Sequence, residues 1–203
     1  MRLLNDATSP FGRKVMMAAL SRHVPLIEEF VDLNNPGQVL PFNPLGQIPV
    51  LILEGGRSLF DSRTILIHLD DCHAGPRLFP PDRRDEMLTA VSLCDGVMEA
   101  VLQRLLETRK PAPQQSPEFI VKLERRILRG LKAMDGISLT PPADNALLAA
   151  DVAAIAALGY CDFRYETGWR SECPRLSEWY AANADRALVR ATAPTRKVPA
   201  SLG

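Results

Sequence analysis

The sequence contains no Cys-x-x-Cys pair, which argues against a dithiol redox motif and against a zinc ribbon. Its four cysteines lie far apart, and we expect reduced, structural thiols. The chain also has no excess charge of either sign, because 24 Lys and Arg balance 24 Asp and Glu, so no overall field draws it to nucleic acid. No stretch reaches the roughly eighteen apolar residues of a membrane span, and the N-terminus lacks the apolar core of a signal peptide. These absences predict a cytoplasmic protein with no nucleic-acid or membrane partner.

The composition is that of an ordinary globular protein. With 203 residues, of which 46% are hydrophobic and 24% charged, the chain can bury a core as one large domain or two small ones. Prolines cluster at 76–81, and there the pattern changes from short alternating elements to long helices. We therefore predict an α/β domain over 1–75, a linker over 76–84 and an all-helical domain over 85–203.

The first part has the pattern strand, helix, strand, followed by two strands and a helix. Because a helix separates the first two strands, they should be parallel, whereas Gly55-Gly56 should join the last two in an antiparallel hairpin. This order predicts a mixed sheet with βαβ-ββα topology. The expected strands cover residues 2–5, 26–31, 48–53 and 58–60, and the expected helices cover 10–23 and 62–71.

Helical periodicity dominates the second part. Apolar residues spaced by three and four predict helices around 87–105 and 120–134. The nearly all-apolar segment 146–158 should be the central buried helix of a bundle, and a last helix is expected at 174–187. The stripe of Met, Val and Cys residues on the helix around 87–105 fits either the core of one chain or an interface with a second copy.

Ser9 stands where the first strand meets the first helix. At such a helix end, unpaired N–H groups and the helix dipole favour an anion, and a serine hydroxyl can donate a short hydrogen bond to a thiolate. Lowering a thiol pKa from about 8.5 to about 6.5 takes roughly 2.7 kcal/mol, which this combination can supply. The alternative interpretation is that Ser9 only caps the helix.

Two further features suit a bound peptide. Pro49 begins an apolar strand, and a cis Ile48–Pro49 bond would turn the Ile48 backbone outward to pair with a peptide; the alternative is an edge-strand proline without a ligand. Asp61 and Ser62 stand at a strand end and a helix start, where they can hold an ammonium and a carboxylate. Taken alone, this pair is also explained as a helix cap.

In this order, the three features resemble the glutathione S-transferase superfamily, and the resemblance covers nearly the whole chain. It implies a thioredoxin-like N-terminal domain, a helical C-terminal domain, glutathione as co-substrate, no metal, and an apolar electrophile in the cleft between the domains. The motifs that carry the resemblance are Ser9-Pro-Phe11, Asn43-Pro-Leu-Gly-Gln-Ile-Pro-Val50, Phe60-Asp-Ser62, Asp95-Gly-Val-Met98 and Gly159-Tyr-Cys-Asp-Phe-Arg164. The last two of these motifs are particularly similar to the YibF-type group of bacterial members.

The resemblance also implies site residues. Ser9 matches the residue that stabilises the glutathione thiolate in serine-type members, and Thr8 is its rival. Relatives of the cysteine type carry Cys at this position, which disfavours deglutathionylation here. Gln47 stands where many relatives carry Lys or another polar residue near the glycyl end. The other implied contacts are Ile48 with Pro49 for the cysteinyl unit, and Asp61 with Ser62 for the γ-glutamyl unit.

For the helical part, the resemblance implies a homodimer in which Asp95 reaches the glutathione amino group of the partner. One departure is plain, because the family usually begins its sixth helix with a Ser/Thr-x-x-Asp capping box and this chain reads Leu148-Ala-Ala-Asp151. A leucine side chain cannot cap a helix. Candidate walls of a co-substrate pocket, each explained equally well by core packing, are Phe11, Met98, Leu102 and Trp169.

Two functions stay open on the sequence alone. The first is a glutathione transferase of the detoxification type, which adds the glutathione sulfur to an electrophile or reduces a peroxide and needs little beyond positioning and deprotonation. The second is a non-catalytic glutathione-binding or scaffold protein with the same fold. A scaffold would be expected to have a decayed clamp, whereas Ile48-Pro49 and Asp61-Ser62 are intact, which favours the transferase.

Overall fold

The computed structural model describes residues 1–73, 75–141, 146–165 and 168–195. Its four strands form one mixed sheet in the order β2-β1-β3-β4, in which β1 runs parallel to β2 and antiparallel to β3, and β3 runs antiparallel to β4. The predicted βαβ-ββα topology is confirmed. β3 is shorter than expected, since Pro49 has no N–H to donate to a sheet. The strands are β1 (Arg2–Asn5), β2 (Ile27–Phe30), β3 (Val50–Ile52) and β4 (Ser58–Leu59).

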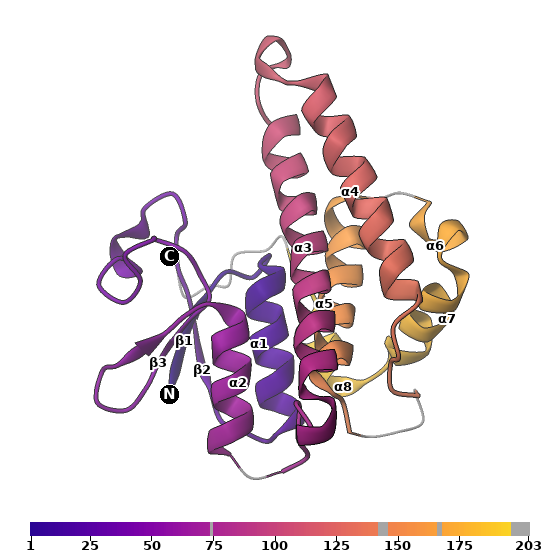
Figure 1. Cartoon of the computed structure of the whole chain (residues 1–203). Coiled ribbons are helices and arrows are strands. Elements are labelled where there is room, and N and C mark those ends of the chain that lie inside the picture. Colours follow the sequence, from indigo (N-terminus) through magenta and orange to yellow (C-terminus); the bar gives the residue numbers. More distant parts are fainter. Residues whose placement is uncertain (74, 142–145, 166–167, 196–203) are drawn as a thin grey trace.

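Helices α1 (Pro10–Ser21) and α2 (Ser62–Cys72) lie between the sheet and the helical part of the chain (Figure 1). Neighbouring residues of β1 point to opposite faces of the sheet, as expected for a strand. Leu3 belongs to the main core with the helices, whereas Leu4 packs in a second cluster with Val39 of the segment that joins β2 to β3. That segment therefore covers the outer face of the sheet.

The second part is all helical, as predicted. Helix α5 (Ala149–Arg164) is its centre, since every residue from Ala149 to Cys161 is buried, and it packs against both α1 and α3. The expected last helix ends at Asn183 and not at 187, and the short helices α6 and α8 were not expected. The other helices are α3 (Arg84–Thr108), α4 (Pro117–Asp135), α6 (Trp169–Glu172), α7 (Pro174–Asn183) and α8 (Ala187–Ala191), with short 3-10 helices at Pro36–Gln38, Pro81–Arg83 and Ala112–Gln114. The boundaries 1–75, 76–84 and 85–203 stay a prediction, and residues 196–203 lie outside the described part.

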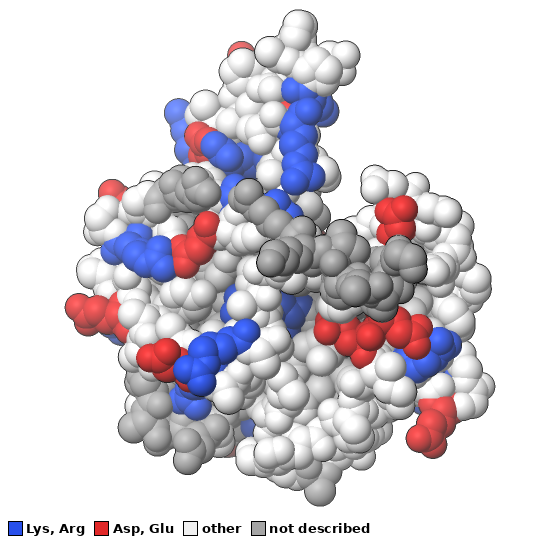
Figure 2. All heavy atoms as spheres, turned by 180° about the vertical axis from the view of Figure 1, so that it is seen from behind, with Lys and Arg blue, Asp and Glu red and all other residues white. Residues whose placement is uncertain are grey.

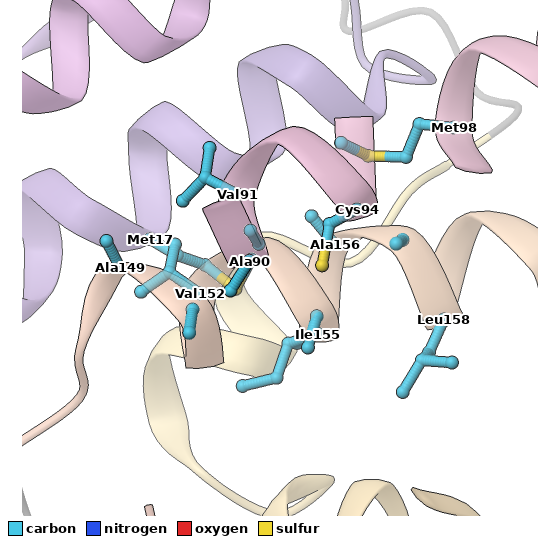
Figure 3. Close-up of a cluster of buried hydrophobic side chains, with 14 of the residues drawn as sticks. Met17, Ala90, Val91, Cys94, Met98, Ala149, Val152, Ile155, Ala156 and Leu158 are labelled. Atoms are coloured by element: carbon cyan, nitrogen blue, oxygen red, sulfur yellow. The ribbon is translucent and has the colours of Figure 1, made fainter. Parts of the chain in front are cut away.

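The apolar stripe of α3 belongs to the core of a single chain. Val91, Cys94 and Met98 are fully buried and lie among side chains of α1 and α5, such as Met17 and Val152 (Figure 3). Of the two interpretations of this stripe, the core is therefore the right one, and the stripe has no surface to offer a second copy. The homodimer stays a prediction that must use other residues.

Asp70, near the end of α2, joins the first part of the chain to the connection that follows it. Its carboxylate is fully buried and accepts hydrogen bonds from the backbone N–H of Leu78 (2.6 Å) and of Phe79 (3.4 Å). It also pairs with the buried guanidinium of Arg22 (3.2 Å) and with Arg77 (2.9 Å). Arg22 in turn donates to the carbonyls of several residues around the end of α2. This cluster holds the connection against the first part.

The start of α5 is stabilised without a capping hydroxyl at Leu148. Asp151 is fully buried, and its Oδ2 accepts hydrogen bonds from the Leu148 N–H (2.7 Å) and from the Thr140 hydroxyl (2.6 Å). Its Oδ1 accepts the Thr140 N–H (2.8 Å). The carboxylate half of the capping box is therefore kept, and Thr140 of the preceding segment anchors the same carboxylate with two further donors.

The thiols differ sharply in their surroundings, and this gives a first prediction. Cys72 is exposed, 3.4 Å from the His68 ring, whereas Cys94, Cys161 and Cys173 are buried and none is in a disulfide. Burial raises the pKa of the Cys94, Cys161 and Cys173 thiols, that of Cys161 to about 12, and the thiolate is the reactive form. A thiol reagent such as DTNB should therefore label one cysteine rapidly in the native protein.

Cys72→Ser is the control for this labelling, because it should remove the rapid phase and leave the slow labelling of the unfolded chain unchanged. Rapid labelling of two or more thiols in the native protein would contradict the burial described here.

Charges of both signs are mixed on the surface. On the face seen in Figure 2, Lys and Arg lie close to Asp and Glu, and wide uncharged areas separate these groups. That mixture agrees with the balanced charge of the sequence. Among the described helices, none combines the length and the apolar character of a membrane-crossing segment.

Candidate functional site

A cleft of about 560 Å³ lies between the first part of the chain and helices α3 and α5. A second hollow of about 460 Å³ adjoins it and shares the segment 47–49 and Asp61 with it. The cleft brings together most of the residues singled out in the sequence, although they come from four separate segments. These are Thr8, Ser9, Phe11, Gln47, Ile48, Pro49, Asp61, Ser62, Asp95 and Leu102.

Two of the candidate pocket walls are not in the cleft. Met98 is 0% exposed and lies in the core between α3 and α5 (Figure 3). Trp169 is 2% exposed, and its indole N–H donates to Asp162 (3.0 Å). The prediction that Met98 and Trp169 form walls of a co-substrate pocket is therefore wrong, because core packing accounts for both. Phe11 and Leu102 do line the cleft.

Ser9 caps α1 at the edge of the cleft. Its Oγ accepts a hydrogen bond from the Gly12 N–H (3.2 Å), and Pro10 follows at the first helical position. Because the oxygen acts here as an acceptor, the hydroxyl proton stays available for a ligand. A glycine is required at position 12, because a Cβ there would lie only 1.6 Å from Oδ1 of Asn5. The missing side chain lets the end of β1 and the start of α1 approach each other closely.

Thr8 also lines the cleft, but its hydroxyl proton is already used. Its Oγ1 donates to the Asp6 carboxylate (2.6 Å), which also accepts the Thr8 backbone N–H (2.8 Å). A hydroxyl has one proton to donate. Of the two neighbouring hydroxyls, the one on Ser9 is therefore the better donor toward an anion in the cleft.

The Ile48–Pro49 peptide bond is cis, as the sequence analysis predicts. The buried Asn43 side chain supports the turn before it, donating to the Gln47 carbonyl (2.8 Å) and accepting from the Leu45 N–H (3.0 Å). Within the described ranges, neither the N–H nor the C=O of Ile48 takes part in a hydrogen bond. Ile48 thus offers a free backbone edge to an extended ligand.

Asp61 and Ser62 form the start of α2. Asp61 Oδ1 accepts from the backbone N–H of Arg63 (3.0 Å) and Thr64 (3.3 Å), which leaves its Oδ2 for a cation. Ser62 is the first helical residue, so its N–H belongs to the unpaired amides that favour an anion. The helix cap and the binding of an amino acid's two charged groups are therefore compatible roles for this pair.

Asp95 reaches the cleft from α3 and already has a partner in its own chain. Its Oδ1 lies 2.5 Å from Nζ of Lys14, which is fully buried on α1. The sequence analysis missed Lys14, whose signal was a charge on the buried side of an amphipathic helix. It also missed Tyr160 of α5, which lines the cleft and stands inside a motif quoted only for its family resemblance.

Comparison with known proteins identifies the family. Residues 8–72 match the glutathione S-transferase N-terminal domain, and residues 97–182 match the glutathione S-transferase C-terminal domain. The GST-like protein YibF of Escherichia coli K12 is 33% identical in an alignment of 184 residues, which covers 87% of this chain and 90% of YibF. The chain belongs to the glutathione S-transferase family.

Solved glutathione S-transferase structures agree over nearly the full length. A glutathione S-transferase of Methylobacillus flagellatus with bound glutathione is 34% identical, with a TM-score of 0.87, over 96% of this chain and 99% of that one. A glutathione transferase family member of Pseudomonas fluorescens Pf-5, also with bound glutathione, is 30% identical, with a TM-score of 0.89, over 96% and 98%. The resemblance found in the sequence and the predicted fold class are confirmed.

Proposed function

We propose that this protein is a glutathione transferase, which binds glutathione in the cleft and stabilises its thiolate with Ser9. The observation that carries the proposal is the hydrogen-bond state of the Ser9 hydroxyl, which accepts from Gly12 and keeps its proton for a ligand. Glutathione in the solved relatives from M. flagellatus and P. fluorescens supports the choice of ligand.

The three features around the cleft match the three parts of glutathione. The γ-glutamyl ammonium would pair with Asp61 Oδ2, and its carboxylate would accept from the Ser62 N–H and hydroxyl at the start of α2. The free backbone edge of Ile48 would pair with the cysteinyl unit in antiparallel fashion. Gln47, exposed beside it, would donate a hydrogen bond to the glycyl end. This placement directs the sulfur toward Ser9.

The chemistry then needs little more than a thiolate in the right place. The Ser9 hydroxyl and the amino end of α1 stabilise the charged sulfur, so the thiol loses its proton to solvent near neutral pH. The sulfur lone pair forms a bond to an electrophilic atom of the second substrate. Phe11 and Leu102 provide apolar surface for that substrate in the same cleft.

Asp61→Asn tests the γ-glutamyl part of the proposal. Asparagine caps a helix as well as aspartate does, so the fold should be kept while the negative charge is lost. We expect the Kd of glutathione, measured by isothermal titration calorimetry, to rise about tenfold, corresponding to about 1.4 kcal/mol for a charge-assisted hydrogen bond at an exposed position.

The matched ligand for this test is glutathione without its α-amino group. It should bind the wild type and Asp61→Asn equally, because neither complex contains the ammonium pair. A variant that weakens both ligands to the same degree would show that Asp61 acts through the fold and not through the ammonium.

Turnover is tested separately from binding. The wild type should be retained on immobilised glutathione, and bound glutathione should show ultraviolet thiolate absorbance near neutral pH. Retention without that absorbance would favour the alternative of a non-catalytic glutathione-binding scaffold.

A homodimer, a cytoplasmic location and a role in detoxification complete the proposal. The segment between β2 and β3 exposes apolar side chains, with Leu40 at 49% and Leu45 at 69% exposure, and a second copy would cover them. In such a dimer Asp95, with Lys14 on one of its oxygens, would offer the other oxygen to the partner's glutathione. Light scattering of the purified protein measures the oligomeric state.

A further inference from the structure

The turn that presents Ser9 to the cleft is shaped by its own residues. It runs from Asp6 to Ser9, and the Ser9 N–H donates to the Asp6 carbonyl (2.9 Å). One oxygen of the Asp6 carboxylate accepts both the N–H of Thr8 (2.8 Å) and its hydroxyl (2.6 Å). All of these bonds are local, so they fix the shape of the turn but not its position relative to the helical part of the chain.

A contact from a distant part of the chain reaches this turn. Ala7 occupies a middle position in the turn, and its carbonyl accepts a hydrogen bond from the backbone N–H of Thr195 (3.2 Å). Ala7 and Thr195 are not among the described residues that line the cleft, although the neighbours of Ala7 on both sides are. The contact therefore leaves the ligand side of the turn open.

Helix α8, which precedes Thr195, is fastened to α1 close to Ser9. Arg13 lies in the first turns of α1, where its backbone N–H donates to the Ser9 carbonyl (3.0 Å). Arg13 is 6% exposed, and its Nη2 donates to the Val189 carbonyl of α8 (3.2 Å). A Cβ at Gly159 of α5 would lie 2.0 Å from Nη1 of Arg13, so the guanidinium packs directly against the backbone of that helix. The Arg13 side chain thus ties α1 to both α5 and α8.

The short connection from α8 to Thr195 is also restrained. The N–H of Thr192 (3.2 Å) and its hydroxyl (2.8 Å) both donate to the Leu188 carbonyl of α8. Pro194, the residue before Thr195, has a fixed φ. The position of the Thr195 N–H is therefore set by α8, and through α8 by the packing of the helical part against α1.

We propose that the segment Ala187–Thr195 is a positioning element for the Ser9 hydroxyl, and that it acts through the hydrogen bond from the Thr195 N–H to the Ala7 carbonyl. This inference rests on the proposed glutathione transferase function. A hydrogen bond to a thiolate weakens steeply when its donor moves out of line, so a turn that is free to shift loses part of the stabilisation. The helical part of the chain thereby sets the position of a hydroxyl that belongs to the first part.

Thr195→Pro tests this role, because proline has no N–H to donate. Thr195→Ala is the matched control, since it removes the side chain and keeps the N–H. In Thr195→Pro, the pKa of bound glutathione, titrated by its thiolate absorbance, should rise by about 0.5 to 1, which is less than the effect of removing the Ser9 hydroxyl itself. Thr195→Ala should titrate like the wild type. The Kd of S-methylglutathione, which has no thiol proton, should be unchanged in both variants.

A double-mutant cycle with Ser9→Ala separates positioning from a general effect on the fold. If the Thr195 N–H acts by placing the Ser9 hydroxyl, Thr195→Pro should cause no further rise in the pKa once that hydroxyl is gone. The proposal would be overturned by the same rise in the Ser9→Ala background, by an equal rise in Thr195→Ala, or by no rise in Thr195→Pro.

Failure of the proposed function would look different. If glutathione bound to the wild type shows no thiolate near neutral pH, or if Ser9→Ala leaves its pKa unchanged, the assignment of Ser9 fails and the role of the segment fails with it. If the wild type has a thiolate that depends on Ser9 and that Thr195→Pro leaves unchanged, only the role of the segment fails.

Discussion

Ser9→Ala is expected to raise the pKa of bound glutathione from about 6.5 to about 8, because the variant loses the hydroxyl that donates to the sulfur but keeps the amino end of α1. At pH 7 that change leaves about eightfold less thiolate. A thiolate of higher pKa is intrinsically more nucleophilic, which offsets much of the loss, so kcat/KM at pH 7 should fall by only about twofold. A pH titration of the thiolate absorbance of the complex measures the shift directly, and the loss of activity should shrink toward pH 9.

Two variants separate the hydroxyl from its neighbours. Thr8→Val should leave the thiolate titration nearly unchanged, since the Thr8 proton is bound to Asp6. Ser116→Ala removes a comparable N-cap from α4, where the Ser116 hydroxyl accepts from the Phe119 N–H (3.3 Å), and should cost about 1 kcal/mol of stability without any effect on the thiolate. A shift in Thr8→Val with none in Ser9→Ala would make Thr8 the thiolate donor.

Asp70→Ala is expected to lower the free energy of unfolding by about 3–5 kcal/mol. The substitution leaves the buried Arg22 guanidinium without its carboxylate and leaves the Leu78 and Phe79 N–H groups without their acceptor. Uncompensated buried charge and buried unpaired donors are among the few causes of so large an effect. Urea unfolding followed by circular dichroism measures it as a lower midpoint.

Arg77→Ala is the control for this measurement. Arg77 pairs with the same carboxylate, but its side chain is 43% exposed, so its loss should cost at most about 1 kcal/mol. If Asp70→Ala were no more destabilising than Arg77→Ala, the buried cluster would not be what holds the connection after α2 in place.

Local patterns predicted most of the secondary structure and several of the site residues. The period of α3 and α4 and the N-cap at Ser9 depend on contacts between residues only a few positions apart. The cis Ile48–Pro49 bond could be anticipated because a proline at the start of an inner strand would otherwise disrupt it. Such features can be found in one chain without knowledge of its distant contacts.

The same patterns could not tell a core side chain from one in the cleft. Met98 and Leu102 stand one helical turn apart on α3, yet Met98 is buried against α5 and Leu102 lines the cleft. Helical periodicity identifies an apolar face but not which part of it the neighbouring helix covers. Trp169 was misplaced because the short helix α6 that begins with this buried residue was not expected, and no sequence pattern shows that Lys14 pairs with Asp95, 81 residues away.

From its amino acids alone, this chain could be assigned a βαβ-ββα sheet, a helical second part and the order of three local features typical of its family, because short-range geometry and hydrophobic periodicity are written into neighbouring residues. Folding was needed to tell Ser9 from Thr8 and to bring Tyr160 into the cleft. The first outcome depends on the conformation of a local turn, in which the Thr8 hydroxyl turns to Asp6 two residues before it, and the second depends on the packing of the distant helices α5 and α1, which only the whole folded chain sets.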